Sequence, residues 1–165
     1  MKKISQFALL LVILLSASAS RPQKTPPKAM LKVGNSMSGL SFNDQFEQKH
    51  QIDKSTQRLI VALDKEPAHA VNEFLADKDP NFLKEHQSLF FVDVSAAPGI
   101  IQKLFILPGL KKYDYPVLIF TEEEEAKPFR LEVNTSKILE VSLQNQKITA
   151  VKEHSPTVDA VKGMF

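Results

Sequence analysis

The chain has 165 residues, a formal net charge of +2 at pH 7, eleven Phe, no Trp and no Cys. This length is typical of one domain with enough chain for a hydrophobic core, and the lack of Cys excludes a disulfide scaffold and any reaction that needs a thiolate. No Arg cluster and no Lys/Arg run interleaved with aromatic residues is present, which argues against nucleic acid as a partner.

The first nineteen residues predict a cleaved export signal. Lys2 and Lys3 precede the apolar run 7–15, and residues 17–19 (Ala-Ser-Ala) supply the small-x-small cleavage pattern. The alternative is an uncleaved membrane anchor, which we disfavour because spanning a bilayer takes about 20 apolar residues. We therefore expect a periplasmic protein with no stable membrane span after cleavage. Loss of the two lysines would bring its formal net charge to 0.

Residues 20–37 are rich in Pro and Lys without an apolar period, which predicts a solvated tether. The domain is then expected to cover residues 38–165. Its first elements are two short strands, 40–42 and 46–52, that flank the turn-forming residues 43–45. This pattern predicts an N-terminal β-hairpin.

A strand–helix alternation follows the hairpin. The continuous apolar run 58–63 is typical of a strand buried on both faces. Pro67 is favourable in the first turn of a helix, where its missing N–H has no partner to lose. The helix is expected to bury Ala68, Val71, Phe74 and Leu75. Asp79 caps a second, shorter helix, and residues 89–94 form the next buried strand.

The second half of the chain begins with a helix over 98–107, with Ile101, Leu104 and Phe105 expected to face the core. Residues 115–120 predict a third buried strand. The four carboxylates of 122–125 lack the ligand spacing of a calcium loop, so a solvated loop is favoured.

The end of the chain predicts a strand pair and a closing helix. Residues 137–143 and 147–152 alternate apolar and polar, as in a hairpin at a sheet edge, and a helix covers 156–165. The whole order predicts an α/β protein, a three-layer sandwich with a mixed central sheet flanked by helices and an N-terminal β-hairpin.

This order resembles the thioredoxin-like fold superfamily, in particular its peroxiredoxin-type and resA-type exported members. The resemblance covers roughly residues 38–165 and depends on the strand 58–63 running into the helix at Pro67, and on Tyr115–Pro116 opening a strand. In the family the first junction carries the reactive Cys and the second carries a cis-proline facing it. The resemblance therefore implies a cis Tyr115–Pro116 bond and a peptide-binding groove formed by Asp64, Lys65, Glu66, Pro67, Tyr115 and Pro116.

The first junction departs from the family, because it reads Asp64-Lys65-Glu66-Pro67. Without a thiol the chain cannot act as a thiol-disulfide oxidoreductase or a thiol peroxidase. The Cys-dependent copper-chaperone role of the fold is in doubt for the same reason.

Other candidate chemistry is weaker. His69 and Glu73 share a helix face, but two residues fall short of the three protein ligands of a zinc site, so a solvated helix face is favoured. Asp64 and Glu66 suit the positive end of a helix without any role in acid–base catalysis. No Gly-rich phosphate loop is present, and no cofactor is predicted.

The leading hypothesis is an exported, redox-inactive thioredoxin-like protein that binds an unknown protein or peptide partner in the envelope through the groove near the cis-proline. The alternatives are a non-thiol enzyme using Asp64, Glu66 and His69, a metal-binding periplasmic protein, or a purely structural envelope protein. We lean against an enzyme. A deep cleft with raised carboxylate pKa values would favour catalysis, and a shallow, partly apolar groove would favour partner binding.

Overall fold

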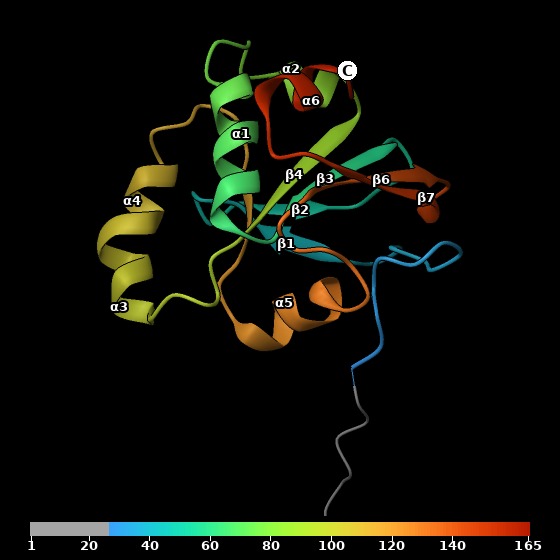
Figure 1. The fold of residues 1–165 in the computed structure, drawn as a ribbon, viewed down its shortest axis with the longest axis horizontal. Helices are drawn as coiled ribbons and strands as arrows, with labels where there is room; N and C mark the ends of the chain where they lie inside the picture. The colour runs from blue at the N-terminus through green and yellow to red at the C-terminus, as the bar shows by residue number, and fades with distance from the viewer. Residues whose placement is uncertain (1–26) are drawn as a thin grey trace, which may run out of the picture.

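The computed structural model describes residues 27–165 (Figure 1). The predicted signal, residues 1–19, and the first part of the predicted tether lie outside the described residues. No helix in the described part of the chain has the length and apolar character needed to cross a membrane.

The central sheet has five strands in the order β5-β4-β3-β6-β7. β3 (Arg58–Ala62) lies at its centre and pairs in parallel with β4 (Ser88–Asp93), which pairs in parallel with β5 (Leu118–Phe120). On the other side β6 (Ile138–Gln144) and β7 (Lys147–His154) add antiparallel strands. The mixed central sheet of the sequence prediction is confirmed.

Helices cover both faces of this sheet (Figure 1). α1 (Lys65–Leu75), α2 (Phe82–Glu85) and α6 (Val158–Lys162) lie on one side, and α5 (Glu123–Arg130) lies on the other. Successive residues of β3 point to opposite faces, so Leu59 and Val61 enter one apolar cluster while Ile60 and Ala62 enter the other. This two-sided burial explains why the strand is a continuous apolar run.

The predicted N-terminal hairpin forms from β1 (Ser41–Asn43) and β2 (Lys49–Gln51). It packs on the α5 side of the sheet, where the Phe42 ring lies edge-on to the rings of Phe91 and Phe120 at centroid distances of 5.0 and 5.6 Å. Aromatic edge-to-face contacts of this kind add to the hydrophobic stabilisation from burial.

The domain begins earlier than the sequence predicts. Ala29, Leu31 and Met37 are buried, and the backbone N–H of Gly34 donates to the Ile148 carbonyl of β7 at 2.8 Å. The prediction of a solvated tether is therefore wrong for residues 29–37. These apolar residues are irregularly spaced among Lys and Gly, so no strand or helix period reveals that they pack.

One continuous helical stretch follows β4. It consists of α3 (Gly99–Ile101), the π-helical turn η1 (Gln102–Ile106) and α4 (Leu107–Leu110). The predicted helix is confirmed, but its predicted inward face is wrong. Gln102 and Leu110 are buried, whereas Ile101, Leu104 and Phe105 are exposed.

The acidic run at residues 122–125 also differs from its prediction. Instead of a loop, Glu122 is the N-cap of α5 and the next three Glu form its first turn. Negative side chains are favourable there because they face the positive end of the helix dipole.

Candidate functional site

The junction that follows β3 is a capped helix start. Asp64 has extended backbone angles and its carboxylate accepts a hydrogen bond from the Lys65 N–H at 2.7 Å. Glu66 adds negative charge to the first turn, and Pro67 is buried there. Asp64 and Glu66 therefore stabilise the start of α1.

A cleft of about 530 Å³ lies beside this junction, and we call it the strand-end cleft. It is bounded by α1, the C-terminal end of β4 and the inner side of α4. Most of its lining is apolar and comes from Leu63, Ala68, Val92, Val94, Ile106 and Leu110. The polar side chains in its lining are Asp64, Lys65, His69, Asn72, Asp93 and Arg130.

Two of these polar residues, Asp93 and Arg130, form an ion pair at the cleft wall. The Arg130 Nε donates to Asp93 at 2.6 Å, and its two terminal nitrogens donate to Glu123 and to the Ser95 hydroxyl, each at 2.6 Å. The hydrogen bond to Asp93 is the main cause that raises the pKa of Arg130 above its ordinary value. The Asp93 side chain is only 1% exposed, so Arg130 compensates a buried charge at the cleft wall.

The structure separates the two junctions that the sequence analysis placed in one groove. β5 runs parallel to β3 and β4, so Tyr115–Pro116 at its start lies at the opposite end of the sheet from Asp64–Pro67 at the end of β3. Pro116 lines a different depression with Asp114 and His50. The predicted groove, with Asp64, Lys65, Glu66 and Pro67 facing Tyr115 and Pro116, is therefore wrong.

The predicted cis bond at Tyr115–Pro116 is also wrong, since the described residues contain no cis peptide. Tyr115 is buried, and its carbonyl accepts a hydrogen bond from the Gln45 amide at 2.8 Å, so its backbone is not open to a peptide. A trans proline ahead of a strand loses no ladder hydrogen bond.

The segment that does face the start of α1 is the start of β6. β6 pairs antiparallel with β3, with Ile138 opposite Ala62. Ser136 and Lys137, which precede β6, therefore lie next to the first junction. Neither residue is a proline.

The candidate metal and catalytic residues on α1 lie on exposed surface, where His69 lines the strand-end cleft together with Asp64. His69 and Glu73 are 3.8 Å apart on a solvent-exposed helix face, as the solvated-face interpretation predicts. Glu66 lines a shallow depression together with His69 and Glu73, and Pro156 and Thr157 form its other side. Among the described residues no cluster of three or more His, Asp or Glu could hold a metal ion.

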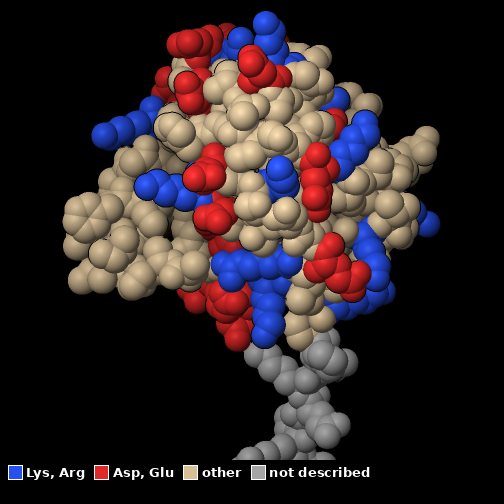
Figure 2. Space-filling view, viewed as in Figure 1, with Lys and Arg blue, Asp and Glu red and all other residues tan. Residues whose placement is uncertain are grey.

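A patch of exposed apolar side chains lies on the outer side of the same helical stretch that walls the cleft. Ile100, Leu104 and Phe105 are 66, 61 and 67% exposed, and Ile101 is 39% exposed. We call these four residues the apolar ridge. Figure 2 shows a lobe of tan side chains at the place of α3 and η1. The one charged residue of these two elements is Lys103.

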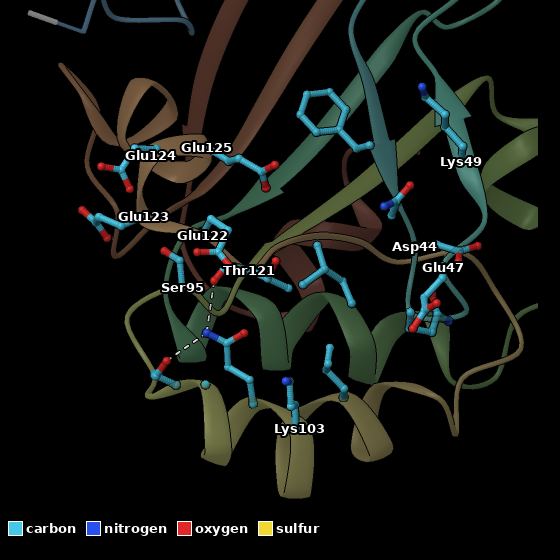
Figure 3. Close-up of a pocket in the computed structure, with 18 of the residues that line it drawn as sticks. Asp44, Glu47, Lys49, Ser95, Lys103, Thr121, Glu122, Glu123, Glu124 and Glu125 are labelled. Carbon is cyan, nitrogen blue, oxygen red and sulfur yellow. Dashed lines mark hydrogen bonds between the residues drawn. The ribbon is translucent and has the colours of Figure 1, made fainter. Parts of the chain in front are cut away.

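A second cavity, of about 830 Å³, lies between the β1–β2 hairpin, the helical stretch and α5, and we call it the hairpin pocket (Figure 3). Glu122–Glu125 line one wall, Lys103 projects from the helical stretch, and Lys49 lies on the hairpin side. Gln102 closes its floor by donating to the carbonyls of Ala97 and Thr121 at 2.9 and 3.1 Å. The pocket is polar and of mixed charge.

The comparisons with known proteins show what fold the chain has and nothing beyond the fold. No family model and no curated protein matches the sequence. A protein from Chlorobium tepidum assigned as the thiol:disulfide interchange protein DsbE superposes with a TM-score of 0.52 at 10% identity, over 81% of this chain and 94% of that one. The peroxidoxin BcpB from Mycobacterium tuberculosis superposes with a TM-score of 0.50 at 15% identity, over the same two shares. The chain thus has a thioredoxin-like fold without cysteine, and thiol-based redox activity is not possible.

Two features of the site were missed from the sequence. Asp93 interrupts the apolar run of β4, and a charged residue at such a position signals a buried partner, although not that the partner is Arg130. The sequence also contained an indication of the exposed ridge. Six large apolar residues fall within positions 100–107, more than one buried helix face requires.

Proposed function

We propose that this chain is an exported, redox-inactive thioredoxin-like protein that binds a protein partner through the apolar ridge and the adjoining strand-end cleft. The observation that carries the proposal is the ridge itself. Four large apolar side chains lie exposed on one helix, three of them by more than three-fifths of their surface. Contiguous exposed apolar surface of this kind typically marks an interaction site.

The cleft supports the same interpretation. Its walls are mostly apolar, its Asp93 is paired with Arg130, and its Asp64 caps α1. Lys65 and His69 also line it, but the His69 side chain is 78% exposed and pairs with Glu73 on the helix face. A partner's apolar side chain needs mainly apolar walls and a cleft of matching dimensions.

Position-resolved photo-crosslinking in the native host tests the proposal. A photo-reactive amino acid replaces Leu104 on the ridge, and a matched variant carries it at Val33, which is 65% exposed in the N-terminal segment. We expect a discrete protein adduct from position 104 alone, and we expect excess unlabelled wild-type protein to compete it away. An adduct pattern shared by both positions, or no adduct from position 104, would contradict the proposal.

A further inference from the structure

We infer that the protein seated on the apolar ridge and strand-end cleft is a second copy of this chain, in a two-fold symmetric dimer. The inference rests on the proposed function, since it assigns an occupant to the same surface. It depends on three properties of that surface: shape, apolar area and charge.

The shape is self-complementary. The ridge is convex and lies on the outer side of the stretch α3–η1–α4, while the inner side of the same stretch, through Ile106 and Leu110, walls the concave cleft. A two-fold interface requires that a surface and its own copy fit together, so that each contact occurs twice. The apolar ridge and the apolar strand-end cleft lie on the same helical stretch. They meet this requirement because each ridge can enter the partner's cleft.

The apolar area matches the needs of a small homodimer. Three ridge side chains are about two-thirds exposed and Ile101 is 39% exposed. Together they offer roughly 300 Å² of apolar surface, taking about 200 Å² for the Phe side chain and about 100 Å² for each Ile or Leu side chain. A standard interface buries about 800 Å² per partner, about 65% of it apolar in homodimers. The ridge thus supplies most of that apolar share, and the cleft walls supply the remainder.

The charge distribution favours a neutral, apolar partner. None of the four ridge residues is charged, and the segment 96–110 contains Lys103 as its one charged residue. Lys103 projects into the hairpin pocket rather than onto the ridge (Figure 3). The chain without residues 1–19 has a formal net charge of 0, so two copies approach each other without net repulsion.

Sedimentation of the purified mature protein over 1–100 μM tests the dimer directly. We expect the mass of two chains for the wild type and at least thirtyfold weaker association for Leu104→Glu, because a charge at the centre of an apolar interface removes a principal contact. Val33→Glu is the matched control and should associate like the wild type. Both positions are exposed, so thermal unfolding should confirm that each variant is folded.

Because the chain has no Cys, single-cysteine variants give a second readout. A mixture of Leu104→Cys chains with chains that carry Lys65→Cys in the cleft lining should yield a two-chain product with a short bifunctional maleimide, and a mixture of Val33→Cys and Lys65→Cys chains should not. A wild type that stays monomeric would overturn the inference, as would a dimer insensitive to Leu104→Glu or a ladder of larger oligomers. A monomer that still gives a specific photo-adduct with another protein from position 104 would leave the proposed function standing. A monomer that binds phosphatidylglycerol vesicles through the ridge and gives no adduct would overturn both.

Discussion

Replacing Gln45 should strongly destabilise the protein. Gln45 is 2% exposed and joins the β1–β2 turn to the chain just before β5. Its amide nitrogen donates to the Tyr115 carbonyl at 2.8 Å and to the Tyr113 carbonyl at 3.3 Å, and its oxygen accepts from the Val117 N–H at 2.8 Å. The side chain thus bonds backbone groups about seventy positions away.

Gln45→Ala removes these three hydrogen bonds and leaves the Val117 N–H and the Tyr115 carbonyl buried without their partner. An unsatisfied buried backbone group costs about 1–3 kcal/mol, so we expect a loss of about 3 kcal/mol in the free energy of unfolding. At about 2–4 °C per kcal/mol for a chain of this size, the midpoint should fall by roughly 10 °C.

Urea denaturation of wild type, Gln45→Ala, Gln45→Glu and Gln48→Ala tests this prediction. Gln45→Glu should be at least as damaging as Gln45→Ala, because it aims a carboxylate at two carbonyl oxygens. Gln48 is exposed on the same hairpin, so Gln48→Ala should stay within about 0.5 kcal/mol of wild type. A loss below about 1 kcal/mol for Gln45→Ala would refute the reasoning, since the three bonds would then contribute little.

Four further predictions concern the Arg130 ion pair, Asp44, Tyr115 and the export signal. Arg130→Met should cost about 3 kcal/mol in urea denaturation because it leaves Asp93 charged and buried, whereas Lys32→Met, which breaks the exposed pair with Glu132, should cost less than about 1 kcal/mol. Burial acts to raise the pKa of Asp44, but hydrogen bonds from His50, Gln48 and Phe46 outweigh it and lower that pKa below its ordinary 3.8. The resulting stabilisation is present above pH 3.8 and is lost as the pH falls through the lowered value, so Asp44→Asn should flatten stability against pH in that acid range. Burial raises the pKa of Tyr115 above its ordinary value of 10.0, so in Tyr113→Phe, which leaves one tyrosine, phenolate absorbance should appear only above that pH while the protein stays folded. If the export signal is cleaved after Ala19, the mass of the protein recovered from the periplasm should lack residues 1–19; an intact mass there would contradict cleavage.

The central architecture could be predicted because strands buried on both faces leave an unmistakable pattern. The run at β3 is apolar over residues 59–63 and the run at β4 over residues 89–92, and each is followed by a residue that caps or starts a helix or turn. The alternation with amphipathic α1 then leaves few topologies open. The β6–β7 pair was accessible because alternation of period two needs no knowledge of the partner strand. The N-terminal hairpin was accessible because turn-forming residues separate its two short strands.

The site could not be predicted because it depends on strand direction and on which face of a helix is buried. The same strand at Tyr115–Phe120 could begin at either end of the sheet, and only its parallel pairing with β4 places Pro116 away from Asp64. Likewise, apolar residues surround the helix at 100–107, so periodicity cannot identify its inner face. The π-helical turn adds to this, because it rotates the side chains that follow it relative to a regular α-helix.

The long-range polar contacts were inaccessible for a further reason. Gln45 with Tyr115 and Arg130 with Asp93 join residues 70 and 37 positions apart. A polar residue in an apolar neighbourhood shows that a partner must exist, because an unpaired buried group is costly. It does not identify that partner, since any donor or acceptor that the topology brings near would serve.

The end of the sheet beside α1 combines two opposite uses of side chains, and this contrast is the strongest argument for a binding role. Asp64, Asp93 and Arg130 are all engaged within the domain, so the polar groups there contribute to folding. The ridge residues contribute almost nothing to folding, because Leu104 and Phe105 remain more than three-fifths exposed. Exposed Leu and Phe beside a mostly apolar cleft also promote association between molecules. The ridge lowers the solubility of the protein and adds almost nothing to its folding stability. Such a surface has a physical rationale only when a binding partner covers it. A thioredoxin-like domain without thiols can supply such a surface without any change to its central sheet.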